Sequence, residues 1–368
     1  MKKLSLLNKQ NRNPNIDFIR ILGLFAIIIH HLLLHGKGYD KFKEVKELRL
    51  LDILCMWHVC SFGLVSGIMM NKSHNFSNLL YLWILVVFYS LCFYIKFNKN
   101  KTNTINFQIF LTNLFPVIHN KYWYFTSYFG IYAFLPFINE SMKILPQIKI
   151  KKIIYFMIWI FFIWTSFYKD SFSLNSGKSP ISLLILYIFG AYIGKFIFFK
   201  KQTNFYKNLV NVLCAIIYLI ASLSIYNVNI KNIYPKINLK IRRLLIPRIN
   251  SFPILLEVFS IIIIISQINF HNYLSRIITF IGPLTFDIYL IHDNQYIRWY
   301  YINNSFNKLP NNLSLLYIII SIFKRGLIIF IICLFISYIR NIIFKILQIK
   351  RFCVICDSIF DIIINSFI

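Results

Sequence analysis

Residues 15–35 read NIDFIRILGLFAIIIHHLLLH, an apolar run long enough to cross a lipid bilayer as one helix. Five ionisable side chains interrupt it, at Asp17, Arg20, His30, His31 and His35. Ionisable groups within a membrane span are rare, and they usually face the interior of a helix bundle or a water-filled cavity. This segment therefore predicts a membrane fold with a polar site inside it.

Helical geometry places most of these groups on one face. At about 100° per residue, Arg20 and His31 come within about 20° of each other around the axis. Asp17 lies three residues before Arg20 and His35 lies four residues after His31, so both share that face. His30 points about 100° away. Arg20 and His31 are about 16 Å apart along the axis, half the hydrocarbon thickness, which predicts a site that extends deep into the membrane.

The whole chain has the composition of a membrane protein. Of its 368 residues, 58% are apolar and 14% are charged, whereas soluble domains average about 45–50% and about 25%. The apolar blocks predict an all-α bundle of about ten membrane helices. These expected spans are residues 16–35, 51–70, 79–95, 122–139, 153–168, 181–199, 208–227, 252–269, 274–292 and 327–347. Residues 313–323 either extend the last helix or form a separate turn.

The apolar blocks also define the expected domain organisation. We predict a membrane domain over residues 1–350 and a short tail over residues 351–368, with no separate soluble domain. The tail contains Cys353 and Cys356, but no second cysteine pair follows to complete a zinc site. We therefore predict no metal centre.

The chain is strongly basic, with 40 Lys and Arg residues against 12 Asp and Glu and a formal net charge of +28. This excess fits a compositional bias without function, contact with anionic lipid headgroups, or an anionic substrate such as a phosphate-bearing cofactor. Nucleic-acid binding is not expected, because the chain offers no soluble basic face. Lys and Arg divide almost evenly between the two sets of loops, so they do not orient the chain.

Three later segments carry residues suited to packing or to substrate binding. Residues 62–67 (FGLVSG) end a span in small residues that favour close helix packing. Trp123 and Tyr124 fit either an interfacial aromatic belt or a platform for a sugar ring. Tyr289 and His292 are three residues apart and share a helix face. We expect these four aromatic and histidine side chains to contact the substrate.

Together, these segments resemble the acyltransferase-3 family of integral membrane acyltransferases, which modify surface polysaccharides and related glycans. Four segments in the right order, across almost the whole chain, carry the resemblance. They are Asp17-Phe-Ile-Arg20 with His31 beyond it, Phe62-Gly63-Leu64-Val65-Ser66-Gly67, Tyr122-Trp123-Tyr124-Phe125 with Tyr132, Pro136 and Asn139, and Phe286-Asp287-Ile288-Tyr289-Leu290-Ile291-His292.

The resemblance implies both termini in the cytoplasm, an acyl-CoA donor that enters from the cytoplasm, and an acceptor hydroxyl reached from the other face. Acetyl is the expected acyl group, and the acceptor is a glycan or its lipid-linked precursor among membrane lipids. His31 is then the base and Arg20 acts at the donor, whereas His30, the competing base, lies off the shared face. Asp17 is about 21 Å from His31 along the axis, so we expect it to fix Arg20.

The chain departs from the family pattern at two places. Many members carry an Arg-x-Arg-like pattern after the second helix, where this chain has only Lys72. We expect Lys72 to contact the donor. Possible substitutes for the missing arginines are Lys149, Lys151, Lys152, Lys200 and Lys201. Asp287 replaces the usual glycine before Ile288, and the sequence offers no reason for it.

Two other functions fit the composition. A polysaccharide or lipid-linked glycan transporter, or flippase, would also have about ten helices with buried polar groups, and it would move glycan without using acyl-CoA. A structural membrane protein leaves the face shared by Arg20 and His31 unexplained. The structural alternative for the first helix is that Asp17 and Arg20 pair with each other and His31 hydrogen-bonds a neighbouring helix.

Overall fold

The computed structural model describes residues 12–42, 45, 47–70, 75–98, 107–165, 172–199, 204–230, 249–307, 309–310 and 313–367. These residues form helices and their connections, with no strand among them. Seven helical segments of this part of the chain are long and apolar enough to cross a membrane. They are residues 14–34, 47–68, 76–97, 180–198, 206–224, 272–292 and 315–346. The predicted all-α membrane fold is confirmed.

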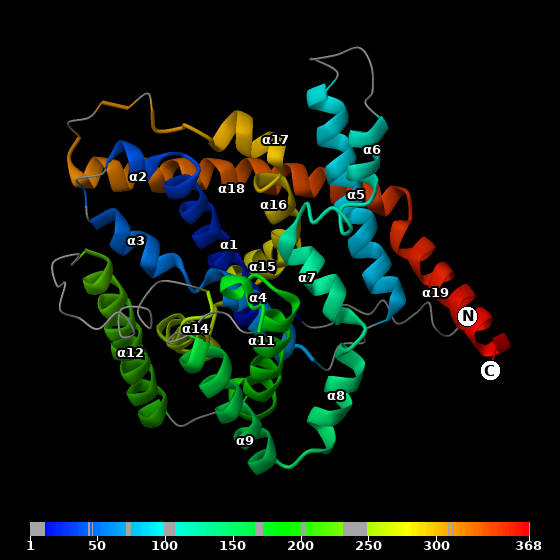
Figure 1. The fold of residues 1–368 in the computed structure, drawn as a ribbon, viewed down its shortest axis with the longest axis horizontal. Coiled ribbons are helices and arrows are strands. Elements are labelled where there is room, and N and C mark those ends of the chain that lie inside the picture. Colours follow the sequence, from blue (N-terminus) through cyan, green and yellow to red (C-terminus); the bar gives the residue numbers. More distant parts are fainter. Residues whose placement is uncertain are drawn as a thin grey trace.

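The helices of the first half run from the N-terminus to the middle of the chain (Figure 1). They are α1 (Pro14–Leu34), α2 (Gly38–Lys41), α3 (Glu47–Cys55), α4 (His58–Ile68), α5 (Phe76–Asn98), α6 (Phe107–Leu114), α7 (Trp123–Tyr132), α8 (Leu135–Ile144) and α9 (Gln147–Ile158), followed by the π-helical turn η1 (Trp159–Trp164).

The second half contains the remaining helices and short turns. They are η2 (Asn175–Gly177), α11 (Pro180–Ile193), η3 (Gly194–Phe198), α12 (Asn204–Ile230), α14 (Phe252–Ser266), α15 (Asn272–Ile281), η4 (Gly282–Leu284), α16 (Thr285–His292), α17 (Gln295–Ile297), η5 (Arg298–Ile302), α18 (Leu315–Ile346) and α19 (Ile349–Phe367).

Several expected spans differ in detail from these helices. Residues 122–139 form two short helices, because Pro136 in the first turn of α8 starts a new helix. Residues 313–323 join the last expected span in the single long helix α18. Arg325 of that helix lies over the ring of Phe306, at 5.2 Å from its centroid. The span expected at 252–269 is the shorter helix α14.

Helix α1 occupies the centre of the bundle. Its start is fixed by the side chain of Asn13, which accepts hydrogen bonds from the amides of Asn15 and Ile16, and by Pro14 in the first turn. The Asn15 amide donates to the Ile265 carbonyl at 2.6 Å, which ties this end to α14. Along its length α1 packs against α4, α15, α16 and α18, so segments distant in sequence meet around it (Figure 1).

Helices α4 and α11 touch at their glycines. A Cβ on Gly67 would overlap the Tyr187 carbonyl, and one on Gly190 would overlap the Leu64 carbonyl. Only glycine permits backbones to approach so closely. The close packing expected from residues 62–67 is therefore confirmed. It fixes α4, so that its opposite face is turned towards α1.

The structure gives Asp287 a role. Its carboxylate pairs with Arg340 of α18 at 2.5 Å and accepts a hydrogen bond from the Tyr89 hydroxyl of α5 at 2.9 Å. Arg340 also donates to the Tyr81 hydroxyl at 3.1 Å. Asp287 and Arg340 are 1% and 3% exposed, so each depends on the other for compensation of its charge. The network joins α5, α16 and α18.

Candidate active site

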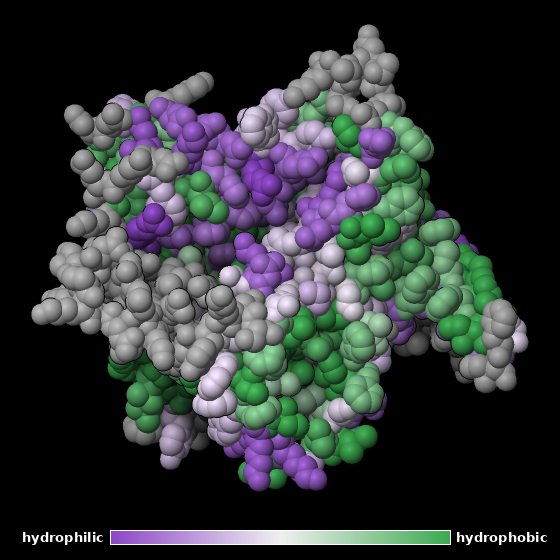
Figure 2. Space-filling model, viewed as in Figure 1, coloured by the Kyte–Doolittle hydropathy of each residue, from purple (hydrophilic) through white to green (hydrophobic). Residues whose placement is uncertain are grey.

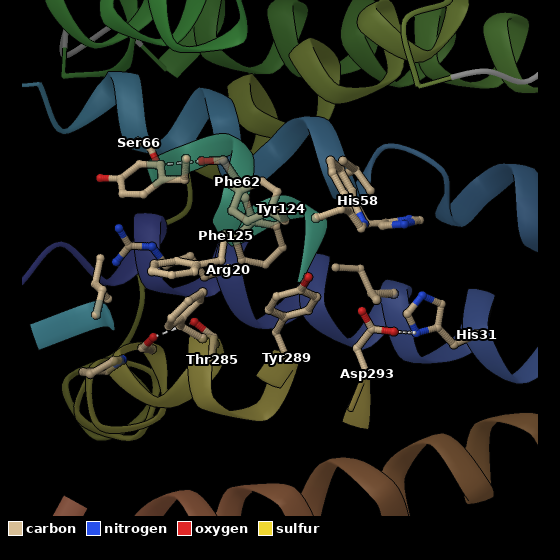
Figure 3. A pocket seen from close by; sticks show the side chains of 18 of the residues that line it. Arg20, His31, His58, Phe62, Ser66, Tyr124, Phe125, Thr285, Tyr289 and Asp293 are labelled. Carbon is tan, nitrogen blue, oxygen red and sulfur yellow. Dashed lines mark hydrogen bonds and ion pairs between the residues drawn. The ribbon is translucent and has the colours of Figure 1, made fainter. Parts of the chain in front are cut away.

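A cavity of about 350 Å³ lies beside α1 and extends from Arg20 to His31 (Figure 3). Its walls come from α1, α4, α7 and the segment from η4 to Asp293, with Leu82 from α5. Three of the α4 side chains that line it, His58, Phe62 and Ser66, recur every four residues, because such residues share a helix face. The lining residues are Arg12, Arg20, Ile27, His31, His58, Val59, Phe62, Ser66, Leu82, Trp123, Tyr124, Phe125, Tyr128, Gly282, Pro283, Thr285, Phe286, Tyr289 and Asp293.

At the Arg20 end of the cavity, which we call the arginine end, two arginines share one carboxylate. Arg12 donates to both oxygens of Asp17, at 2.8 and 2.7 Å, and Arg20 Nη1 lies 3.1 Å from Oδ1 of the same residue. Gly282 lies against this carboxylate, where a Cβ would displace it. One carboxylate between two guanidinium groups leaves one net positive charge, so this end of the cavity suits an anion.

At the other end of the cavity, which we call the histidine end, His31 faces a carboxylate. Its Nδ1 atom lies 3.7 Å from Oδ1 of Asp293, and Arg298 Nη1 lies 3.2 Å from the same oxygen. The first distance is longer than a hydrogen bond but within reach of an ion pair. Burial raises the pKa of Asp293 to about 6, and the charges of Arg298 and Lys178 oppose this rise. The Asp293 carboxylate is thus ionised at neutral pH.

Other histidines surround this end. His30 turns away from the cavity and pairs with Asp52, Nδ1 to Oδ1 2.6 Å, in agreement with its offset around the helix. The ring of His58 is 5.3 Å from that of His30, and its Nδ1 bonds to the Cys55 carbonyl. Burial, with the nearby charge of Arg298, lowers the pKa of His35 to about 4. His35 is therefore neutral near pH 7.

Aromatic side chains form the middle of the cavity. The ring of Tyr289 lies 6.3 Å from that of Tyr124, and Trp123 is in edge contact with Tyr124 at 5.7 Å. Figure 3 shows Tyr289 between the Arg20 end and Asp293. Any group that passes from one end to the other therefore passes these rings.

The structure places most of the predicted site residues at this cavity. Those that line it are Arg20, His31, Trp123, Tyr124 and Tyr289. Asp17 supports Arg20. His292 does not line the cavity. It is fully buried, with Nδ1 2.7 Å from the Ile288 carbonyl and its ring 5.3 Å from that of His31.

The expected lysine contacts are not at the cavity in the described part of the chain. Lys72, Lys200 and Lys201 lie outside the described residues. Lys149, Lys151 and Lys152 belong to α9, which does not line the cavity.

Sequence reasoning missed three residues of the site. Arg12 precedes the first helix, where no helical periodicity applies. Asp293 follows Tyr289 by four residues, so the same spacing rule that linked Tyr289 to His292 would have found it. Arg298 reaches Asp293 from the next turn.

Comparison with known proteins adds one finding. A family model described as an acyltransferase domain matches residues 13–339. That range includes every lining residue of the cavity except Arg12. No curated protein and no solved structure matches the chain.

Proposed function

Because this chain belongs to that acyltransferase family and is a membrane protein, we propose that it moves an acetyl group from acetyl-CoA to a sugar hydroxyl of a surface polysaccharide or its lipid-linked precursor. The observation that carries the proposal is the single cavity that joins an arginine pair to a His–Asp pair. Transfer from a phosphate-bearing donor needs an anion site and a base connected in this way. The arginine end and both termini then face the cytoplasm, which supplies the donor.

Arg12 and Arg20 bind the phosphates of the donor in this proposal. Guanidinium groups present paired N–H donors that match phosphate oxygens. Asp17 holds both groups at one place while leaving a net positive charge. Arg12 thus supplies the second cation that the sequence led us to seek at Lys72.

His31 acts as the base. It takes the proton of the sugar hydroxyl as the hydroxyl oxygen attacks the thioester carbonyl, the carbon–sulfur bond breaks, and the CoA thiolate takes that proton from His31. Asp293 faces His31 Nδ1, where it holds the ring and compensates the imidazolium. Such contacts are often long in unliganded structures and tighten with substrate bound.

Tyr289 stands beside the reacting carbonyl in this arrangement. A hydroxyl that donates to the developing oxyanion stabilises the transition state more than the ground state. Ser66, a potential nucleophile on the cavity wall, donates to the Phe62 carbonyl at 2.9 Å. We propose that the acyl group passes directly from the thioester to the sugar.

The test compares surface glycan from cells with and without the gene. NMR before and after mild alkali reads the ester-linked acyl groups, and the membrane level of the protein is measured alongside. We expect esters only in cells that have the gene. Equal esterification in both, with less glycan at the surface when the gene is absent, would instead establish a transporter.

Asp17→Asn is expected to raise the KM for acetyl-CoA about tenfold, with kcat little changed. The carboxylate holds two guanidinium groups at one place, and its loss frees both, which outweighs the gain in net positive charge. Steady-state kinetics of the purified protein measure the split. An unchanged KM with a lost kcat would contradict this role. Asp293→Asn is the comparison variant, because we expect it to lower kcat and to leave the KM for acetyl-CoA unchanged.

Transfer is expected to fall about tenfold per pH unit below about pH 6, because one protonation there removes the active form. The pKa of Asp293 is raised to about 6, so its carboxylate is present above that pH and lost below it. A protonated Asp293 no longer compensates a positive His31. The pH profile of kcat/KM checks this, and Asp293→Asn should be slow and flat between pH 5 and 7. If Asp293→Asn still loses activity below pH 6 as the wild type does, the loss is caused by protonation of another group.

A further inference from the structure

His58 of α4 lines the cavity without belonging to the arginine pair or to the His31–Asp293 pair. The residue is only 4% exposed, and its Nδ1 atom contacts the carbonyl of Cys55, the last residue of α3. A carbonyl oxygen can only accept a hydrogen bond, so Nδ1 carries the proton. In the neutral ring, Nε2 is then unprotonated and can accept a hydrogen bond.

Two contacts fix the position of this ring. Carbonyls in the last turn of a helix lack a helical partner, and the bond from Nδ1 satisfies that of Cys55. The Ser61 hydroxyl donates to the His58 carbonyl at 2.6 Å, and a Cβ on Gly23 of α1 would overlap that hydroxyl. The start of α4 is therefore held against α1, and the ring is held at the end of α3.

The Nε2 atom is left open to the cavity. In the described part of the chain, Nδ1 has a partner whereas no protein group donates to Nε2. Figure 3 shows His58 on the α4 wall, across the cavity from Asp293. The nearest lining residues along the two helices are apolar, Val59 beside His58 and Ile27 one turn before His31. A buried acceptor without a donor costs free energy, so a ligand that donates to Nε2 gains affinity.

A polar ligand can reach this end from the surface. Figure 2 shows hydrophilic residues gathered around a hollow over α2 and α17, the elements that follow α1 and α16 directly. His35 and Asp293 are the residues that end α1 and α16 on this side. The hollow therefore leads towards the histidine end rather than the arginine end.

His31 and His58 differ in the group behind the ring. His31 Nδ1 faces the Asp293 carboxylate, which compensates the imidazolium when His31 takes a proton. His58 Nδ1 meets an uncharged carbonyl, and Asp52 is already paired with His30. A proton on His58 would leave a buried positive charge without a counter-charge, which is costly. His58 is therefore suited to accept a hydrogen bond rather than to act as the base.

From this geometry we infer that the acceptor sugar donates a second hydroxyl to Nε2 of His58, while the hydroxyl that is acetylated meets His31. The inference rests on the proposed function and states a requirement for its acceptor, which is a sugar with two free hydroxyls that reach the histidine end together. A sugar without the second hydroxyl leaves Nε2 unpaired and binds more weakly.

The experiment uses the purified full chain in lipid nanodiscs, with acetyl-CoA and the surface glycan of cells that express the protein, stripped of esters by mild alkali. His58→Asn is the main variant, because the amide nitrogen of asparagine takes the place of Nδ1 while Nε2 is lost. We expect the KM for the glycan to rise about tenfold, the scale of one hydrogen bond. The kcat and the KM for acetyl-CoA should change little.

Two further variants complete the comparison. His58→Gln should keep most of the affinity for the glycan, because the amide oxygen of glutamine reaches the place of Nε2 and accepts there. His271→Asn is the matched control, since His271 is exposed at the start of α15 and does not line the cavity. A tenfold rise in the glycan KM of folded His58→Gln would contradict the inference even if His58→Asn did not fold.

Three results in folded His58→Asn would overturn the inference. They are an unchanged KM for the glycan, a raised KM for acetyl-CoA in its place, which would put the donor at Nε2, and a lost kcat with both KM values unchanged, which would give His58 a part in the chemistry. Failure of the proposed function is distinguishable, because the wild-type protein would then acetylate no glycan at all.

Discussion

Replacing His31 with alanine is expected to lower the rate of acyl transfer about 10²- to 10⁴-fold, the contribution of a general base. His31 is the histidine that both lines the cavity and faces Asp293. Without it, the attacking hydroxyl keeps its proton and remains a weak nucleophile. Turnover of labelled acetyl-CoA by the purified protein measures the loss in kcat.

His30→Gln is the matched control, because His30 adjoins His31 in sequence but pairs with Asp52 outside the cavity. Its rate should stay close to that of the wild type once the folded fraction is equal. Binding of acetyl-CoA should be retained in His31→Ala, since the arginine end is intact. A large loss in His30→Gln with a small one in His31→Ala would assign the base to His30.

Asp287→Ala is expected to destabilise the fold by about 3–5 kcal/mol, because it leaves Arg340 buried without its counter-charge. We also expect lower activity, because Asp287 and Tyr289 belong to the same helix α16 and Tyr289 lines the cavity. Thermal unfolding in detergent, followed by the loss of the monodisperse peak, measures the change.

The double variant Asp287→Ala/Arg340→Leu is the control for this prediction. It removes both charges together and should recover much of the stability lost in the single variant. Asp361→Ala, on the exposed face of α19, should leave the melting temperature nearly unchanged. If Asp287→Ala unfolds at the same temperature as the wild type, the Asp287–Arg340 pair contributes little to stability and another contact holds α16 in place.

The first helix shows how much of the site the sequence could predict. The 3.6-residue period alone placed Arg20 and His31 on one face and His30 on another, and the structure has this arrangement. The small residues of 62–67 likewise predicted where α4 meets a neighbour. These features depend on the geometry of a single helix, so its sequence is sufficient to predict them.

The remaining features depend on tertiary contacts. Asp293 meets His31, and Arg340 meets Asp287, only after distant helices pack, and no spacing rule connects such pairs. The sequence also could not tell which side chains on one helix face reach the cavity. Tyr289 and His292 share a helix face, yet the packing of α16 puts one at the cavity and buries the other.

The Asp287–Arg340 pair also bears on how the chain enters the membrane. Asp287 belongs to the span at 272–292 and Arg340 to the span at 315–346, so the acid is synthesised first. An aspartate opposes insertion by about 2.5–3.5 kcal/mol at the centre of a span and by less towards its end, where Asp287 lies. We therefore expect the span at 272–292 to become more stable in the bilayer once Arg340 of α18 pairs with Asp287. We therefore expect a chain truncated before α18 to lack the arginine that compensates Asp287, and with it a stable position for Tyr289 at the cavity.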